Sequence, residues 1–217
     1  MRSRMTRVIY VRHGESEANL LRLFAGQKDF PLTACGQRQA EKIATHLKEN
    51  YSIDMIFSSD LCRALQTAAP TAKAFGLEII PVSDLRERGV GVWEGRSHKE
   101  ILETDGEEML AARAEKRSPN PEGSEPISAL HQRVYKAEDE ILARSKGKCV
   151  AVFSHTCVMH TMARRWQESL PKTDFVFENA SISVVDYDDG GSVVAIPVLS
   201  FQGHLGEDAT FAPKHLF

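Results

Sequence analysis

Short apolar runs alternate along this chain with longer segments in which apolar residues recur every three or four positions. The runs at residues 7–12, 53–57 and 149–153 are nearly all apolar, which is typical of strands covered on both faces. The longer segments have the spacing of amphipathic helices. Strands that alternate with helices favour a three-layer α/β/α sandwich with a mostly parallel central sheet. The sequence therefore predicts an α/β fold of this kind.

Four long helices are predicted from this spacing. The first begins after Thr33, a plausible N-cap, and the second after residues 58–60, whose side chains offer capping oxygens. Two more cover residues 127–142 and 159–166. Two of the four follow a predicted strand within a few residues, as the α/β pattern requires.

The remaining strand signals are shorter. Residues 78–82 form a strand candidate that Pro81 would end or confine to a sheet edge. Residues 182–187 and 193–198 flank the sequence Asp-Asp-Gly-Gly, which indicates a hairpin.

The whole chain, residues 1–217, is expected to form a single domain. With 42% hydrophobic residues it can build one substantial core. In residues 84–122 the apolar residues do not recur at a regular spacing, and the segment contains several glycines and prolines. We expect an insertion there, with one short helix near residues 99–110.

Composition excludes several classes of protein. The net charge of -3 gives no basic excess of the kind that nucleic-acid binding needs. The four cysteines form no CxxC pair, so they are interpreted as reduced core thiols rather than as a zinc site or a disulfide framework. The first apolar run is too short for a signal peptide or a membrane span. A cytoplasmic protein without nucleic-acid or membrane partners is therefore expected.

Three reactive groups lie where the predicted strands end. His13 follows Arg12 after the first strand, His155 follows the strand at 149–153, and Arg63 lies in the first turn of a helix. Ligands of open α/β sheets bind beyond the carboxyl ends of the strands. Each group alone has a bland explanation, namely a hydrogen-bonded structural histidine or a solvated arginine. Since the helix dipole disfavours a cation at that end, Arg63 suits a bound anion.

An ordered set of motifs carries a resemblance to a known family. The set comprises residues 11–16, 19, 31–33, 36, 39–40, 58–61, 63–64, 66–68, 85–88, 93–95 and 153–155. In this order it resembles the motif set of the histidine phosphatase superfamily, which is phosphoglycerate mutase-like, over roughly residues 6–187. The RHG triplet alone is unspecific. The chain length and the Trp-Glu-Gly motif are similar to the broad phosphatase branch.

The resemblance implies roles for individual residues. His13 corresponds to the family's nucleophile, Glu87 to its proton donor and His155 to the second histidine of its phosphate pocket. The implied phosphate-binding residues are Arg12, Arg63, Asn19 and Gly26. The implied chemistry needs no metal, and no cofactor is expected for this chain.

This chemistry is physically consistent. A neutral imidazole can attack phosphorus in line, while the arginines and a protonated His155 neutralise the equatorial oxygens. Glu87 can give a proton to the leaving alkoxide and later accept one from the water that hydrolyses the phosphohistidine. The expected function is hydrolysis of a small phosphorylated metabolite.

Two alternatives stay open. One is phosphoryl transfer of the phosphoglycerate mutase type, and the other is a catalytically silent phosphate-binding module. Thr156 stands where the family often has glycine, and Ala18 where it often has tryptophan, so both can alter the pocket. Nucleotide-binding glycine loops and the HExxH motif of zinc hydrolases are absent from the sequence.

The natural substrate and the oligomeric state do not follow from the sequence. Substrate choice is expected to depend on residues 88–126. Six basic residues there could contact a second anionic group: Arg88, Arg96, Lys99, Arg113, Lys116 and Arg117. The bland interpretation is that most of them are solvated.

Overall fold

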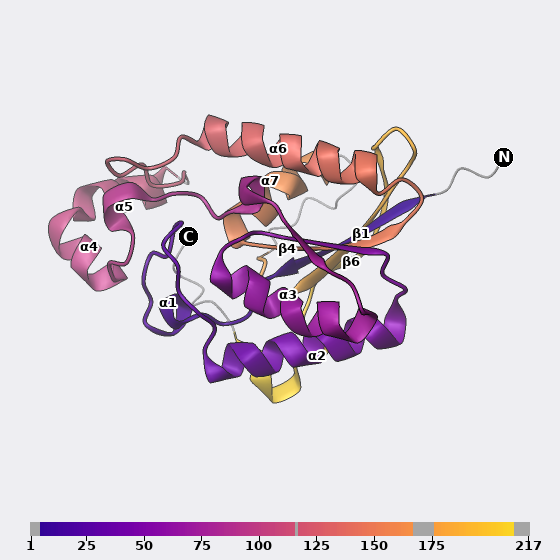
Figure 1. Cartoon of the computed structure of the whole chain (residues 1–217). Coiled ribbons are helices and arrows are strands. Elements are labelled where there is room, and N and C mark those ends of the chain that lie inside the picture. The colour runs from indigo at the N-terminus through magenta and orange to yellow at the C-terminus, as the bar shows by residue number, and fades with distance from the viewer. Residues whose placement is uncertain (1–4, 116, 167–175, 211–217) are drawn as a thin grey trace.

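The computed structural model describes residues 5–115, 117–166 and 176–210, and its centre is a six-stranded sheet (Figure 1). The strands are β1 (Thr6–Arg12), β2 (Met55–Ser58), β3 (Ile79–Pro81), β4 (Cys149–Ser154), β5 (Ile182–Tyr187) and β6 (Val193–Phe201). Their order in the sheet is β3-β2-β4-β1-β5-β6. Neighbours among the first four pair in parallel, whereas β5 runs antiparallel to both β1 and β6. The predicted α/β sandwich with a mostly parallel sheet is confirmed.

The predicted edge strand and hairpin are also confirmed. β3 lies at one edge of the sheet, where Pro81 removes no hydrogen bond from a central ladder. β5 and β6 pair directly, with irregular register at several positions. The hairpin thus forms the other edge.

Four long helices cover the two faces of the sheet. They are α2 (Ala34–Asn50) and α3 (Cys62–Phe75) on one face, and α6 (Ile127–Arg144) and α7 (Thr156–Trp166) on the other, as Figure 1 shows. Side chains of β1 alternate between the faces: Val8 and Tyr10 pack under α6 and α7, while Ile9 and Val11 pack under α2 and α3. β1 and β4 pair in register from Arg7 with Cys149 to Arg12 with Ser154, so their carboxyl ends lie level.

The helix starts differ from expectation at two places, since α7 begins at Thr156, before residue 159, and the cap of α3 is not the expected one. The Thr33 side chain accepts a hydrogen bond from the Gly36 amide at 3.0 Å, so the predicted N-cap of α2 is confirmed. For α3 the predicted capping by residues 58–60 is wrong, because the N-cap is Leu61. Asp29 from a distant loop caps the helix instead, with its Oδ1 2.8 Å from the Cys62 amide nitrogen. The carboxylate of Asp60 is held by Arg86.

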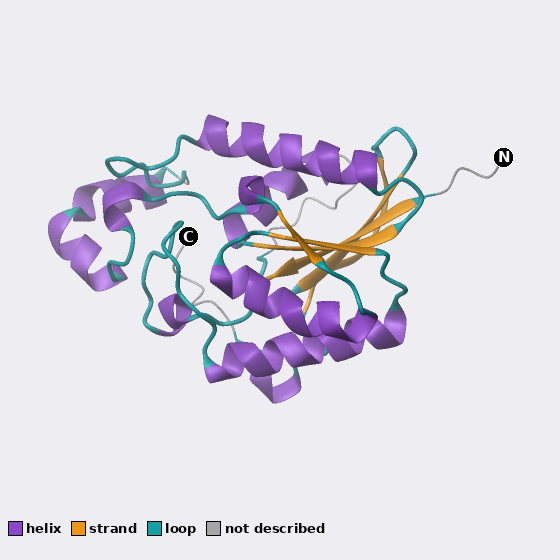
Figure 2. Ribbon diagram, in the orientation of Figure 1, coloured by secondary structure: helices purple, strands orange, loops and turns teal. Residues whose placement is uncertain are grey.

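The segment between β3 and α6 holds two short helices where one was expected. These are α4 (His98–Thr104) and α5 (Gly106–Ala114), which lie to one side of the sandwich, and Figure 2 shows loops on both sides of the pair. Ser97 and Glu100 form a capping box that begins α4. Asp105 has non-helical φ and ψ angles, so it ends α4 and α5 begins at the next residue.

Four smaller elements complete the described chain. A short helix, α1 (Glu17–Leu20), follows β1, and 3₁₀ turns occur at Ser83–Leu85, Gly91–Trp93 and Gly206–Asp208. The four cysteines are free and half-buried rather than core residues. No helix in the described ranges is long and apolar enough to cross a membrane.

Candidate active site

The candidate site forms where β1, β2 and β4 end side by side. Arg12 of β1 pairs with Ser154 of β4, and Ser58 of β2 pairs with Phe153. The residues that follow the three strands, His13, Ser59 and His155, therefore leave the sheet at the same edge. The ring centroids of the two histidines are 5.1 Å apart.

His13 is buried, and one of its ring nitrogens has a fixed role. Nδ1 lies 2.7 Å from the carbonyl oxygen of Gly14. Because a carbonyl only accepts, Nδ1 carries the proton, and Nε2 keeps its lone pair in the neutral ring. Burial, with the charges of Arg63 and Arg12, holds the pKa of His13 well below its usual value. The ring is therefore a neutral imidazole with a free nucleophilic nitrogen.

His155 is fully buried beside it. Its Nε2 shares a hydrogen bond of 2.8 Å with Ser59 Oγ, whereas its Nδ1 has no partner among the described residues. Burial and the nearby Arg63 also hold the pKa of His155 well below its usual value. The protonated His155 expected from the sequence is thus disfavoured in the free protein.

The two arginines present buried hydrogen-bond donors. Arg12 Nη1 donates to the Phe177 carbonyl at 2.6 Å, and Arg63 donates to the carbonyls of Gly26 (2.9 Å) and Lys28 (3.1 Å). Within the described part of the chain, Nε of each arginine is buried without a partner. Buried donors normally have partners, so an anion is the natural complement to this pair.

Glu87 reaches the same place from the loop after β3. Its carboxylate accepts from the Arg88 amide at 2.8 Å and from the Cys157 amide, in the first turn of α7, at 3.2 Å. Burial lowers the pKa values of Arg12 and Arg63, and the negative charge of Glu87 opposes this lowering at both arginines, which indicates that all three groups lie close together. The structure therefore gathers both histidines, both arginines and the carboxylate that the sequence singled out.

Asn19 and Gly26 lie at the border of this group. The Asn19 Oδ1 atom accepts from Ser16 Oγ at 2.9 Å and from Asn179 Nδ2 at 3.1 Å. The amide NH₂ group of Asn19 is thereby left as the end that can donate to a ligand. Gly26 has φ +49°, and a Cβ there would overlap the side chain of Glu94. Its carbonyl holds Arg63, so Gly26 contributes through the backbone.

Two residues of the site had no assigned role in the sequence analysis. Ser59 lies within a quoted motif, so the motif was the signal that could have found it. Asn179 is buried and donates to the His13 carbonyl at 3.2 Å across 166 positions of sequence. No local pattern marks it, because it follows no predicted strand and belongs to no motif.

The described basic residues of the insertion are paired with protein groups or exposed. Arg88 donates to the carbonyls of Pro119 and Glu125, Arg96 pairs with Asp105, and Arg117 pairs with Glu108. Lys99 and Arg113 are exposed, and Lys116 lies outside the described residues. Arg88, Arg96 and Arg117 thus have protein partners, and a contact of these residues with a second anionic group stays a prediction.

The part of the chain that the structure describes holds no group of three histidine, cysteine or acidic side chains arranged to bind a metal ion. The site is instead built from nitrogen donors and one carboxylate. Such a set suits an anionic ligand with ionisable oxygens, such as a phosphoryl group.

Comparison with known proteins agrees with this geometry. Residues 8–197 match the family model described as histidine phosphatase superfamily (branch 1). The chain is 31% identical to phosphoserine phosphatase 1 of Hydrogenobacter thermophilus, over 94% of this chain and 96% of that protein. It is 34% identical to a probable phosphoglycerate mutase, GpmB, of Escherichia coli, over 85% of this chain and 86% of the relative.

Solved structures give the same result. A protein from Bacillus stearothermophilus, YhfR, superposes with a TM-score of 0.81 at 27% identity, over 92% of this chain and 99% of that one. A mycobacterial glucosyl-3-phosphoglycerate phosphatase superposes with a TM-score of 0.78 at 25% identity, over 92% of this chain and all of that one. This chain is therefore an enzyme, and it belongs to branch 1 of the histidine phosphatase superfamily.

Proposed function

We propose that the protein is a phosphomonoester hydrolase that forms a phosphohistidine on Nε2 of His13. The observation that carries this proposal is the hydrogen bond between His13 Nδ1 and the Gly14 carbonyl. It leaves Nε2 unprotonated in a ring whose pKa is lowered by burial and by two arginines. A nucleophile in this state needs no separate base to attack phosphorus.

The phosphoryl group is held by the surrounding donors in this proposal. The unpartnered Nε atoms of Arg12 and Arg63 would donate to its oxygens, along with the Asn19 amide and the backbone near Gly26. His155 would contribute through Nδ1, because Ser59 occupies its Nε2. These donors are in place before the substrate arrives, so stabilisation of the transition state needs little reorganisation.

Glu87 is assigned the proton transfers. Its carboxylate accepts from the amide of Cys157, two residues after His155, and its charge acts on both arginines, which supports a role at the leaving oxygen of the same phosphoryl group. An alkoxide leaves only when protonated, and the carboxylate formed can then take a proton from the attacking water. One residue thus serves both halves of the reaction.

Hydrolysis is proposed over mutase-type transfer, and a small phosphorylated metabolite is the proposed substrate class. One relative, which aligns with 94% of this chain, is named a phosphoserine phosphatase, although a probable phosphoglycerate mutase is also a relative. Only short helices and loops lie between Glu87 and α6, so little chain is available to shield a phosphohistidine from water. A cytoplasmic location stays a prediction from the sequence.

One experiment separates the alternatives. The enzyme is incubated with 3-phosphoglycerate and a bisphosphoglycerate primer, and both phosphate release and 2-phosphoglycerate formation are followed. We expect phosphate as the main product, here or with another member of a panel of phosphorylated metabolites. Isomerisation much faster than phosphate release would replace hydrolase by mutase. Failure to turn over any panel member or an aryl phosphate would favour a silent binding module.

A further inference from the structure

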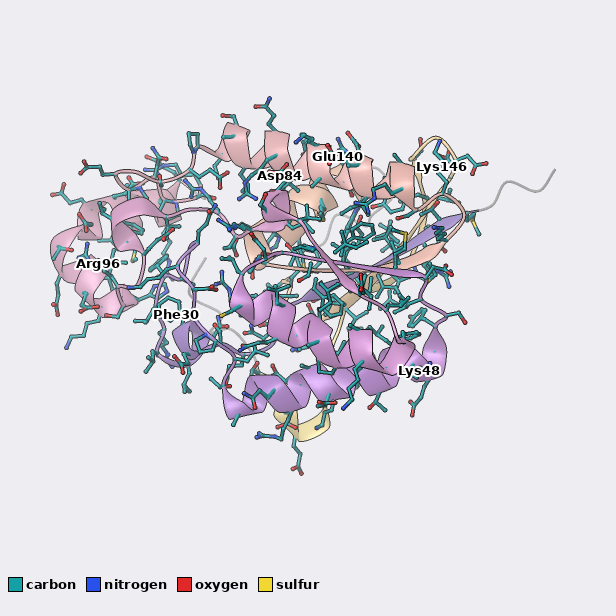
Figure 3. The ribbon with its side chains drawn as sticks, in the orientation of Figure 1. Phe30, Lys48, Asp84, Arg96, Glu140 and Lys146 are labelled. Atoms are coloured by element: carbon teal, nitrogen blue, oxygen red, sulfur yellow. The ribbon has the colours of Figure 1, made fainter. Side chains whose placement is uncertain are left out.

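Arg133 of α6 reaches out of the helix layer to the loop that carries Glu87. Its Nη1 donates to the carbonyls of Asp84 and Arg86, both at 2.7 Å. Its Nη2 donates to the carbonyl of Glu87 itself at 3.0 Å. Figure 3 shows Asp84 beside α6, where this contact forms. A single side chain therefore holds three carbonyls within four residues.

Glu125, just before α6, completes the arrangement. Its Oε1 accepts from Arg133 Nε at 2.6 Å, and its Oε2 accepts from Arg133 Nη2 at 2.8 Å. Glu125 also binds the other side of the loop, since its amide donates to the Gly89 carbonyl at 2.9 Å and its Oε2 accepts from the Gly89 amide at 3.3 Å. The loop is thus held on both sides of Glu87. We call Arg133 and Glu125 the bracket.

The bracket uses the full capacity of its arginine. A guanidinium has five N–H donors, and the five acceptors described above account for all of them. Both bracket side chains are only 17% exposed, so solvent screens the pair weakly. Lysine has three donors on a flexible stem and cannot reproduce this planar fork.

The bracket does not touch the Glu87 carboxylate. That group binds the amides of Arg88 and Cys157, so its position relative to a bound phosphoryl group depends on the course of the loop backbone. Residues 86–89 have no regular secondary structure that would fix this course, and Val90 forms an isolated bridge with Ser124. A misplacement of about 1 Å can cost about 10²-fold in rate.

We propose that Arg133, supported by Glu125, is a positioning residue for proton transfer by Glu87. The inference rests on the proposed function. Its consequence is selective, because the phosphate donors Arg12, Arg63 and His155 are held by other contacts. Loss of the bracket should impair departure of poor leaving groups and leave attack by His13 intact.

The test compares two substrates in one set of variants. For Arg133→Lys we expect kcat/KM on an alkyl phosphate to fall by about 10²-fold, while kcat/KM on a nitrophenyl phosphate falls less than about threefold, because nitrophenolate needs little protonation. The ratio kcat/KM is compared because it excludes the later hydrolysis of the phosphohistidine, in which Glu87 also acts. Glu125→Gln keeps one oxygen acceptor, so it should also impair the alkyl phosphate more than the nitrophenyl phosphate, but with a smaller loss. It also serves as the second measure where Arg133→Lys folds poorly.

Arg165→Lys is the matched control. Arg165 bridges α7 to Glu138 and Asp139 of α6, so it is an interhelical ion pair of the same packing layer with no contact to the Glu87 loop. The substitution Arg165→Lys should leave the ratio of the two activities unchanged, whether or not it lowers the thermal stability. Equal losses on both substrates for Arg133→Lys, with phosphohistidine still formed by the wild type, would overturn this inference alone. A wild type without phosphohistidine would overturn the proposed function first, and this inference with it.

Discussion

Two buried polar regions of the molecule differ in how completely their groups are paired. One is the candidate site. The other, which we call the Glu138 cluster, lies under α6 and α7 and contains Glu138, Tyr10, Tyr187, Arg165 and Trp166. In that cluster both tyrosine hydroxyls lie 3.0 Å from Glu138 Oε1, Arg165 donates to Oε2 at 3.1 Å, and the Trp166 indole donates to Tyr187.

The candidate site, in contrast, contains several buried polar atoms without partners among the described residues. Among the described residues, Nε of Arg12, Nε of Arg63 and Nδ1 of His155 are buried without partners, whereas no polar side-chain atom of the Glu138 cluster is so left. A satisfied network stabilises and specifies a core, while open donors cost free energy unless a ligand binds. The difference teaches that pairing distinguishes these two regions more clearly than burial or charge does.

Of the substitutions that test this comparison, removal of the nucleophile should reduce turnover most. His13→Ala should lower turnover by at least about 10⁴-fold, because the covalent route is lost. Acid-labile, base-stable labelling of the protein by radioactive phosphate substrate should disappear with it. Assays in EDTA provide the control, since activity should persist without added metal. Labelling that survives the substitution would place the nucleophile on another residue.

Glu87→Gln should cause the second largest loss of activity, and this loss should depend on the leaving group. We expect a loss of about 10²–10⁴-fold on an alkyl phosphate and a much smaller loss on a nitrophenyl phosphate, because only the alkoxide needs a proton to leave. The kcat/KM on each substrate measures this, since it reports the steps up to departure of the leaving group and excludes hydrolysis of the phosphohistidine. Identical losses on both would show that Glu87 does not transfer the proton.

Ser59→Ala should have a moderate effect. His155 Nε2 would lose its partner, and a single hydrogen bond is worth about 0.5–1.5 kcal/mol, so kcat/KM should fall by up to about tenfold. The tautomer of His155, followed by ¹⁵N NMR, should become less uniform. Thr71→Val is the matched control, since that buried hydroxyl of α3 has no partner among the described residues. An unchanged NMR signal in Ser59→Ala would contradict the role of Ser59.

Breaking the Glu138 cluster should affect activity least. Glu138→Ala removes the shared acceptor of two tyrosine hydroxyls and one of the two carboxylates that pair with Arg165, so it should lower the free energy of unfolding by about 1–3 kcal/mol. The kcat of the folded fraction should stay within about twofold. Chemical denaturation and assays at low temperature check both statements. A large loss of kcat in fully folded protein would erase the distinction between the two regions.

Much of the fold could be predicted because its signals are local. The apolar runs gave the strands, and the Asp-Asp-Gly-Gly turn gave the β5–β6 hairpin. Capping of α3 by Asp29 could not be predicted, since the carboxylate comes from a loop 33 positions away. The break between α4 and α5 was missed because a single residue, Asp105, interrupts an otherwise helical segment.

The site shows the same division. His13, Arg12, Arg63, Glu87 and His155 stand beside strand ends or in ordered motifs, so the sequence identified them, and the structure brings them together. Their supporting contacts were not predictable in this way. Asn179 and Arg133 act through backbone carbonyls of distant loops, and any residue type can supply a carbonyl, so no pattern at the partner position marks such a contact.

The distance along the chain between those supporting groups has a kinetic consequence. Arg12 binds the Phe177 carbonyl across 165 positions, and Asn179 binds the His13 carbonyl across 166. Contacts of such long range close large loops and form slowly compared with local helices. During synthesis, the residues that hold the first strand's histidine and arginine emerge only after most of the chain is made. The onset of phosphatase activity in a refolding or translation experiment would therefore report the closure of the whole sheet.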